Sequence, residues 1–407
     1  MPDPAPPRGS MLAPFRVRSF RFQYPADLCT SWAFEMEVLI LGWYILVETG
    51  SVLLLTLFAA LQYIGTLFAP VFGLVGDRIG HRTLLCMMRA SYGAMAALLM
   101  ALALTGTMQP TPVFVIATLC GLIRQSDLVM RNALIGETIP HEQLMGAMSL
   151  SRTTSDSARV IGALAGASLF AAFGIAPAYA GVTALYALSF LLTLGVAGRR
   201  PHPPAEATSP WRDILLASTY VWNTPLLLAA FLIALLVNFC AFPLTNGLLP
   251  FVASEVYGTD ERGLSYLVAS WAGGALLGSI TLIRVGSYLP PARMMIVFCG
   301  AWYLALLVFA HAPTLPSAIA VLGFAGFVQS LSLVPLAVLM LREAAPQIRG
   351  RVMGMRMLAV YSLPFGLLAA GPLIKAWGFA ATCTAYALLG LACTAAIAIR
   401  WRRELWR

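Results

Sequence analysis

The feature that most limits the folds open to this chain is a series of long apolar runs, each of a length that can cross a lipid bilayer. A transmembrane helix needs about 20 mostly apolar residues. Hydrophobic residues make up 59% of the 407 residues and charged residues only 11%, whereas charged residues form about a quarter of an ordinary soluble protein. The sequence therefore predicts an all-α polytopic membrane protein. Its twelve expected spans lie at about 28–49, 51–75, 84–106, 112–136, 145–173, 177–197, 226–251, 264–284, 294–312, 316–341, 352–376 and 379–400.

Basic residues are distributed unevenly between the two sides of these spans. Arginines precede the first span, follow the second and the sixth, precede the eleventh and close the chain, whereas only Arg262 and Lys375 fall on the other side. Arg and Lys in short loops mark the cytoplasmic side of a membrane protein. Because the number of spans is even, we expect an inner-membrane protein with both termini in the cytoplasm. This topology accounts for the net charge of +9, so a nucleic-acid partner is not expected.

The longest polar interruption divides the chain into two halves of six spans. It contains a stretch around Trp211 to Trp222 that predicts a short amphipathic helix on the membrane surface. Similar segments begin at Pro140, before the fifth span, and at Pro346, before the eleventh. Secondary transporters are commonly built from such repeats, with the substrate site between them near the midplane. The expected parts are a cytoplasmic tail over 1–27, a six-helix bundle over 28–197, a cytoplasmic linker over 198–225, a second six-helix bundle over 226–400 and a cytoplasmic tail over 401–407.

A charged tight turn joins the second and third spans, with the sequence Gly73-Leu74-Val75-Gly76-Asp77-Arg78-Ile79-Gly80-His81-Arg82. It resembles the signature loop of the major facilitator superfamily, a family of secondary transporters, with His81 where a second Arg or Lys is usual. Further segments are similar to the bacterial drug- and siderophore-exporter branch of that superfamily, whose members are proton antiporters. These segments are Thr49-Gly50-Ser51, Arg131-Asn132-Ala133, Pro140-His141-Glu142-Gln143-Leu144 and Arg349-Gly350-Arg351-Val352.

The resemblance implies twelve transmembrane helices in two pseudo-symmetric six-helix bundles, the major facilitator fold. It also implies that Asp77 faces the start of the eleventh helix, around Arg349 to Gly354, and latches the two bundles on the cytoplasmic side. The macrodipole at a helix N-terminus favours a nearby anion. A turn that only sets the topology is the alternative. The predicted gating residues are Gly73, Asp77, Arg78, Gly80, Arg82, Arg349, Gly350 and Arg351.

Two segments depart from the exporter pattern. In the fifth span, Gly162-Ala163-Leu164-Ala165-Gly166 has alanine where the antiporter motif has proline, and in the fourth span Arg124 is followed by Gln125-Ser126-Asp127. Both departures weaken the resemblance to proton-drug antiporters without affecting the fold.

Ionisable side chains inside the spans gather in the N-terminal half, and such groups are costly in hydrocarbon and are usually functional. Arg124 and Asp127, like Asp156 and Arg159, are three residues apart and could pair on one helix face. They could equally pair between the fourth and fifth helices and form a structural brace. The candidates for proton coupling are Glu35, Glu37, Asp127 and Asp156.

Glu35 and Glu37 point about 200° apart on a helix, so at most one of them faces a central cavity. Desolvation favours the protonated form of a carboxyl group, which would allow proton exchange during transport. Glu35 is the better positional match to the acidic residue that the exporter branch often carries, and structural pairing with Arg124 or Arg159 is the alternative. The candidates for the substrate cavity are Tyr44, Glu48, Arg124, Arg159, Asn238, Asn246, Trp271, Gln329 and Tyr361.

The sequence offers no chemistry for an enzyme. It has no phosphate-binding loop, its only lysine is Lys375, and its four histidines lie in or near loops, so we expect neither a metal nor a cofactor. The expected function is proton-coupled efflux of a drug, siderophore or organic acid by alternating access, in a monomer embedded in the bilayer. The arginines leave room for an anionic or zwitterionic cargo. An uncoupled facilitator or importer of a metabolite or lysolipid is the alternative, and a non-transporting sensor or scaffold is a remote one.

Overall fold

The computed structural model describes residues 13–68, 72, 75–76, 78–140, 143–197, 210–285, 289–345, 348, 352, 355–356 and 358–406, and these residues form helices and turns without a strand. The first half consists of η1 (Ala13–Arg16), α1 (Arg18–Thr49), α2 (Val52–Leu61), η2 (Ile64–Phe68), α4 (His81–Leu104), α5 (Pro110–Thr138), α6 (Leu144–Phe173) and α7 (Ile175–Leu194). The linker contains α8 (Pro210–Asn223). The second half consists of α9 (Pro225–Leu236), η4 (Val237–Ala241), α10 (Phe242–Asn246), α11 (Leu249–Phe251), η5 (Val252–Val256), α12 (Glu261–Val285), α13 (Pro291–Ala310), α14 (Leu315–Glu343), α16 (Ser362–Trp377), α17 (Phe379–Arg400) and α18 (Arg402–Leu405).

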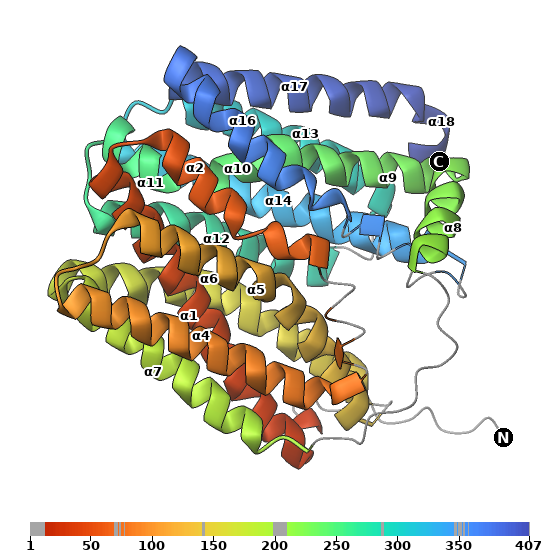
Figure 1. Cartoon of the computed structure of the whole chain (residues 1–407). Helices are drawn as coiled ribbons and strands as arrows, with labels where there is room; N and C mark the ends of the chain where they lie inside the picture. The colour runs from red at the N-terminus through yellow and green to blue at the C-terminus, as the bar shows by residue number, and fades with distance from the viewer. Residues whose placement is uncertain are drawn as a thin grey trace.

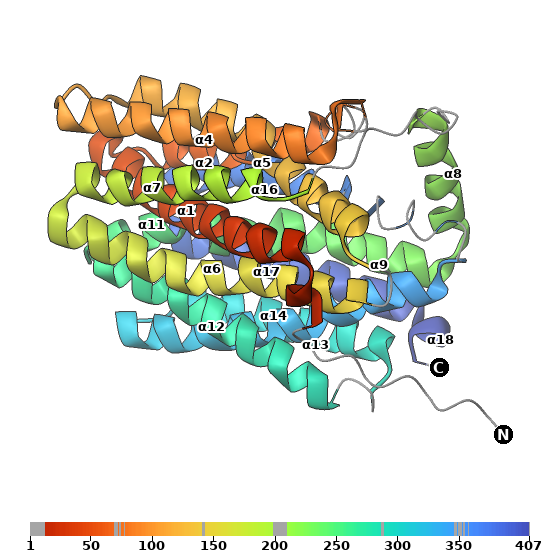
Figure 2. The same cartoon turned by 90° about the horizontal axis from the view of Figure 1, so that it is seen from below.

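The long helices run roughly parallel to one another in two bundles that lie side by side (Figure 1 and Figure 2). Helix α8 crosses one end of the bundles, close to where α18 ends the described chain and α1 begins. We call this the α8 end. Helix α8 covers the residues for which the sequence predicts an amphipathic helix, and it exposes Leu216 and Trp222 while burying Val221. The hydroxyl of Tyr220 donates to the carbonyl of Glu343 at 3.4 Å, which ties α8 to the end of α14.

Nine helices in the described residues are long and apolar enough to cross a membrane. The three other expected spans correspond to α2 with η2, to α6 and to α16, which are shorter or less apolar. The first helix begins at Arg18, so residues 18–27 are helical and precede the expected span. Arginines mark the membrane surface, and a helix can continue through that surface into water, so the expected cytoplasmic tail over 1–27 stays a prediction.

The seventh expected span is broken where the sequence predicts one helix. Two π-helical turns, η4 and η5, interrupt it, and both Pro243 and Pro250 lie between these two turns. Proline has no backbone N–H and clashes with the preceding turn, so it weakens a helix and favours a break or kink. The backbone there is held within the protein, which is the condition under which irregular segments occur at membrane depth.

Single glycines turn the chain at equivalent places in the two halves. Gly174 separates α6 from α7, and Gly378 separates α16 from α17, and both have φ of +81°. Glycine adopts this conformation at no steric cost. Because the two glycines terminate corresponding helices of the two bundles, they support the internal repeat seen in the sequence.

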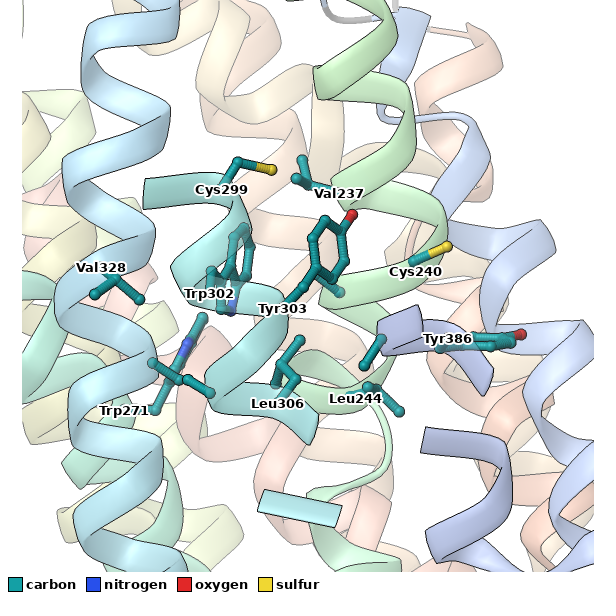
Figure 3. Close-up of a cluster of buried hydrophobic side chains, with 14 of the residues drawn as sticks. Val237, Cys240, Leu244, Trp271, Cys299, Trp302, Tyr303, Leu306, Val328 and Tyr386 are labelled. Atoms are coloured by element: carbon teal, nitrogen blue, oxygen red, sulfur yellow. The ribbon is translucent and has the colours of Figure 1, made fainter. Parts of the chain in front are cut away.

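The C-terminal bundle has an aromatic core. Trp302 and Tyr303 are fully buried and lie within stacking distance, with ring centroids 6.5 Å apart, and Trp302 also meets Phe242 edge-on. Figure 3 shows Trp302 and Tyr303 with Cys240, Cys299 and Tyr386 around them. All seven cysteines are free thiols, and the four buried ones fill the interior as small apolar groups.

The two bundles meet along two helix pairs. Helix α6 packs against α12, and α2 packs against α16, which lies next to it in Figure 1. A Cβ added to Gly371 in α16 would overlap the hydroxyl oxygen of Thr56 in α2. Near the end opposite α8, Gly42 of α1 lies against the ring of Pro250 in α11. These contacts close that side of the interface and leave space between the bundles nearer the middle.

Candidate central cavity

A cavity of about 280 Å³ lies between the two bundles. Helices α1, α2, α5 and α6 line it from the N-terminal half, and α10, α11 and α12 line it from the C-terminal half. Apolar residues such as Leu39, Phe58 and Val268 form much of its wall. Its polar groups are Glu35, Gln62, Tyr63, Arg124, Gln125, Arg159, Thr245 and Asn246. A cavity that combines an apolar wall with several polar groups is suited to binding a small amphipathic molecule.

Close packing of α1 against α6 sets the position of Glu35. A Cβ added to Gly162 would lie 2.9 Å from the Cβ of Glu35 and 3.1 Å from the carbonyl oxygen of Trp32. A Cβ added to Gly166 would lie 3.0 Å from the Cα of Met36. The two glycines of the altered fifth-span motif therefore allow α1 to approach α6. This approach places the carboxylate of Glu35 in the cavity.

Arg124 lies in the cavity without a carboxylate partner in the described residues. Its guanidinium donates to Gln62 Oε1 at 3.1 Å and lies 4.5 Å from the centroid of the Phe34 ring. Gln62 reaches Arg124 because α2 and η2 approach α5 closely: a Cβ on Gly65 would overlap the carbonyl oxygen of Gly121. A neutral hydrogen-bond acceptor and an aromatic face hold the cation in place, and its charge is not neutralised.

Arg159 spans the interface between the bundles. It extends from α6, and its guanidinium carbon lies 5.6 Å from the ring centroid of Trp271 in α12. A backbone contact between Gly326 of α14 and the carbonyl of Trp271 fixes α12 at this point. Trp271 is 3% exposed, and its indole N–H has no hydrogen-bond partner in the described part of the chain.

Tyr63 and Asn246 line the cavity from the two halves of the chain. Tyr63 follows α2 in the N-terminal half, and Asn246 ends α10 in the C-terminal half. The cavity therefore has polar groups from both bundles.

The cavity continues toward the α8 end. A second space of about 150 Å³ shares Glu35, Arg124 and Arg159 with the first and adds Ser31 and Ser155, which lie one turn nearer that end of α1 and α6. A third space of about 50 Å³ lies between Arg159 and the Gln329 side chain of α14. The side-chain amide oxygen of Gln329 (Oε1) is buried without a partner among the described residues.

Glu37 is placed away from the cavity, inside the N-terminal bundle. It is 6% exposed and accepts a hydrogen bond from Tyr186 of α7 at 2.9 Å. Glu35 and Glu37 thus occupy opposite sides of α1. Asp156 lies in α6, but its side chain is outside the described structure.

A buried cluster of four charged side chains holds the N-terminal bundle together. Arg89 of α4 donates to Asp27 of α1 and to Thr193 of α7. Arg131 of α5 pairs with Asp127 one turn away, and its Nε lies 3.6 Å from Asp27. The pairing of Asp127 with Arg124 considered on the sequence does not occur, because Arg131 lies on the other side of Asp127 at i+4 spacing and takes its carboxylate.

The remaining cavity candidates lie elsewhere. Tyr44 donates to the carbonyl of Met108 at 3.1 Å and Glu48 is exposed, both toward the end opposite α8. Asn238 donates to the carbonyl of Ala234 at 2.8 Å within the same span, which satisfies its amide locally. Tyr361 donates to the carbonyl of Thr66 and so joins the two bundles nearer the α8 end.

The signature loop is described only in part. Gly73, Asp77, Arg349, Gly350 and Arg351 lie outside the described residues, and so does any contact between them. Arg78 is exposed, Gly80 precedes α4 with φ of +89°, and Arg82 donates to the carbonyl of Leu194 at 2.6 Å. His81 Nδ1 lies 2.6 Å from the Glu137 carboxylate.

Sequence reasoning missed several of these residues. Asp27 falls in the expected tail, Arg89 interrupts the apolar run of an expected span without being a candidate, and Arg131 enters only as part of a family motif. Charge within a span is a signal that could have identified Arg89. Gln62 and Tyr63 carry no such signal, because uncharged polar residues also occur where transmembrane helices simply hydrogen-bond to each other.

Two helical bundles with a mixed polar and apolar cavity between them are the architecture of a multi-pass membrane transporter. Residues 26–369 match the sequence profile of the Major Facilitator Superfamily. The chain therefore belongs to the Major Facilitator Superfamily, and its fold is the twelve-helix fold of that superfamily. Membership implies a small-molecule substrate.

Relatives of known structure or activity agree with this assignment. The chain is 28% identical over 384 residues to the multidrug efflux pump Tap of Mycobacterium tuberculosis (strain H37Rv), covering 90% of this chain and 89% of Tap. A mutant of the nucleoside transporter NupG superposes with a TM-score of 0.73 at 16% identity, over 93% of this chain and 99% of NupG. A bacterial homologue of the lysosomal transporter Spinster, in an inward-facing conformation, gives a TM-score of 0.73 at 13% identity over 97% of both chains. The two structural likenesses concern the fold.

Proposed function

We propose that this protein is a secondary active exporter of the inner membrane, which moves a small amphipathic molecule outward in exchange for protons. The observation that carries the proposal is the central cavity, in which Glu35 makes no hydrogen bond or ion pair within the described residues. Ionisable groups inside the membrane-spanning part of a transporter are usually functional, and a carboxylate without a partner can exchange a proton for cargo. The 28% identity with the efflux pump Tap supports export as the direction of transport.

Transport proceeds by alternating access in this proposal. The contacts at Gly371 and at Gly42 close the end opposite α8, and the cavity extends from Glu35 toward the α8 end. The arginine-rich termini and linker place the α8 end in the cytoplasm. The described conformation is then the one that accepts cargo from the cytoplasm. A latch between Asp77 and the Arg349 to Gly354 segment stays a prediction for the opposite conformation.

A single chain supplies every wall of the cavity. We therefore propose that the monomer is the functional unit, with the bilayer covering its exposed apolar side chains. Both termini are cytoplasmic in this arrangement.

The test is proton release from everted membrane vesicles, followed with a pH-sensitive dye while drugs, siderophores and organic acids are added. Wild type is compared with Glu35→Gln and with the matched variant Glu37→Gln, in which Tyr186 can still donate to the amide oxygen. We expect a substrate-triggered loss of luminal protons that disappears in Glu35→Gln and persists in Glu37→Gln. Exchange of labelled substrate at saturating concentration should survive in Glu35→Gln, because alternating access itself does not need the carboxylate.

Other results favour the alternatives. Counterflow of a metabolite or lysolipid that is unchanged in Glu35→Gln would indicate an uncoupled facilitator or importer. Proton release that persists in Glu35→Gln would remove the coupling role of Glu35. An inserted, folded protein without any flux would indicate a sensor or scaffold.

A further inference from the structure

The central cavity holds two opposite charges that do not pair with each other. Glu35 and Arg159 both line it, yet neither makes a hydrogen bond or an ion pair within the described chain. Opposite charges that share an apolar space normally pair, because a lone ion there carries a large desolvation cost. Here α1 and α6 hold them apart, and space for a ligand lies between them and Trp271.

Further donors and acceptors without partners lie next to these charges. The indole N–H of Trp271 lacks a partner among the described residues, and the guanidinium of Arg159 lies over the same ring. The indole N–H is itself buried, so the guanidinium of Arg159 supplies the donors that an acidic group in the cavity can reach. Arg124 differs, since Gln62 already accepts from it and Phe34 covers its face. The donors without a partner are on the Arg159 side of the cavity.

We propose that the cargo is a zwitterion, whose acidic group binds Arg159 and whose ammonium group binds Glu35. This inference rests on transport through the central cavity, as proposed above. A purely cationic cargo would leave Arg159 without a counter-ion. A purely anionic cargo would leave Glu35 either protonated or ionised without a counter-ion. An ammonium group at Glu35 competes with a proton for the same carboxylate, as antiport requires. The apolar wall formed by Phe58, Leu39 and Val268 accommodates the remainder of the molecule.

Four related probes test the two contacts separately. They are Nε-dansyl-L-lysine, its methyl ester, its Nα-acetyl derivative and its Nα-acetyl methyl ester, which are zwitterionic, cationic, anionic and neutral. Their dansyl fluorescence rises in an apolar cavity and reports binding to the full-length protein in nanodiscs. Each is titrated against wild type, Arg159→Gln, Glu35→Gln and the control Arg124→Gln.

In wild type we expect the zwitterion to bind most tightly, and loss of either charge to weaken binding about tenfold or more, the usual effect of a charge-assisted hydrogen bond. Esterifying the carboxylate should cost little in Arg159→Gln, and acetylating the amine should cost little in Glu35→Gln. Acetylating the amine should still weaken binding about tenfold in Arg159→Gln, and esterifying the carboxylate should still weaken binding about tenfold in Glu35→Gln. Equal affinity of all variants for the neutral probe verifies that the cavity is intact.

The proposal is overturned if the zwitterion is not the preferred probe of wild type, or if Arg159→Gln retains the penalty for esterification. It is also overturned if Arg124→Gln abolishes that penalty while Arg159→Gln does not. These are binding measurements, so they stay informative if vesicles show no proton release. Conversely, antiport of a cation that is indifferent to Arg159→Gln would uphold the exporter and refute the zwitterion.

Discussion

The buried charges of the N-terminal bundle belong to two groups with different neighbours. Asp27, Arg89, Asp127 and Arg131 neutralise one another and join α1, α4 and α5, although Asp127 and Arg131 also border the second space. Glu35, Arg124 and Arg159 line the central cavity without a partner of opposite charge in the described residues. A buried ion whose partner is removed destabilises a protein strongly, because its desolvation is no longer offset. The first group therefore carries stability, and the second group is available for a ligand.

The residue-scale prediction concerns Asp27. Asp27→Asn leaves the fully buried guanidinium of Arg89 without a carboxylate, and we expect the free energy of unfolding to fall by about 3–5 kcal/mol. Denaturation by sodium dodecyl sulfate in mixed micelles measures this change. The exposed Glu48 provides a control, since Glu48→Gln should change stability by less than about 0.5 kcal/mol. An Asp27→Asn protein as stable as wild type would mean that Asp127 alone balances both arginines.

At the scale of the element, the contact between α1 and α6 decides where the cavity carboxylate lies. Gly162 and Gly166 face α1 along one side of α6, at the spacing that allows two membrane helices to pack closely. The alanine that replaces proline in this motif keeps α6 regular through this stretch, since α6 runs without interruption to Phe173. The altered motif therefore serves packing against α1.

The element-scale prediction compares two glycines. In Gly162→Ala the added methyl group would lie 2.9 Å from the Glu35 Cβ, whereas Gly136 in α5 has open space around its Cβ position. We expect Gly162→Ala to lower the free energy of unfolding by about 1–3 kcal/mol through overpacking. Gly136→Ala should raise it by up to about 1 kcal/mol through helix propensity. Stability is measured by thermal unfolding of both variants, and their affinity for the zwitterionic dansyl probe is measured by fluorescence titration.

Equal changes in stability for Gly162→Ala and Gly136→Ala would contradict the proposed role of the α1–α6 contact. If Gly162→Ala retained wild-type stability and wild-type affinity for the zwitterionic probe, the approach of α1 to α6 would not control the position of Glu35.

At the scale of the whole molecule, the two bundles are in contact at the end opposite α8, and the cavity lies between them nearer the middle. The α2–α16 contact at Thr56 and Gly371 and the contact of Gly42 with Pro250 close the end opposite α8. Helix breaks at Pro243 and Pro250 lie in the same region. Rocking of one bundle against the other would have to open these contacts.

The whole-molecule prediction is that a disulfide across this contact stops transport. In Thr56→Cys/Gly371→Cys the two sulfurs lie within reach, because a Cβ on Gly371 would already touch the Thr56 side chain. We expect the oxidised double variant to lose substrate flux and reduction to restore it, while the probes still bind. Thr56→Cys alone and Gly371→Cys alone are the controls for reactions of the native thiols. Wild-type flux through a fully cross-linked protein would be incompatible with alternating access at this contact.

The sequence by itself determined the class of this protein. Twelve apolar runs, alternating arginines and the Gly73 to Arg82 loop predict a two-bundle membrane transporter of the major facilitator type, and the family assignment and fold agree. These properties depend on hydrophobic length, loop charge and local motifs, which are written along the chain. The 200° between Glu35 and Glu37 also follows from helix geometry, so the sequence predicts that at most one of them meets the cavity.

Only the tertiary structure decided which charges face the cavity. Helical periodicity fixes the angle between Asp127 and its neighbours Arg124 and Arg131, but both arginines are within reach at i−3 and i+4. The rotation of α5 against α1 and α4 selects Arg131, because Asp27 from a distant part of the chain completes that cluster. The breaks in the seventh span likewise depend on packing around Pro243 and Pro250. Contacts between residues far apart in the sequence set helix rotation, and hydrophobic length and local periodicity do not specify those contacts.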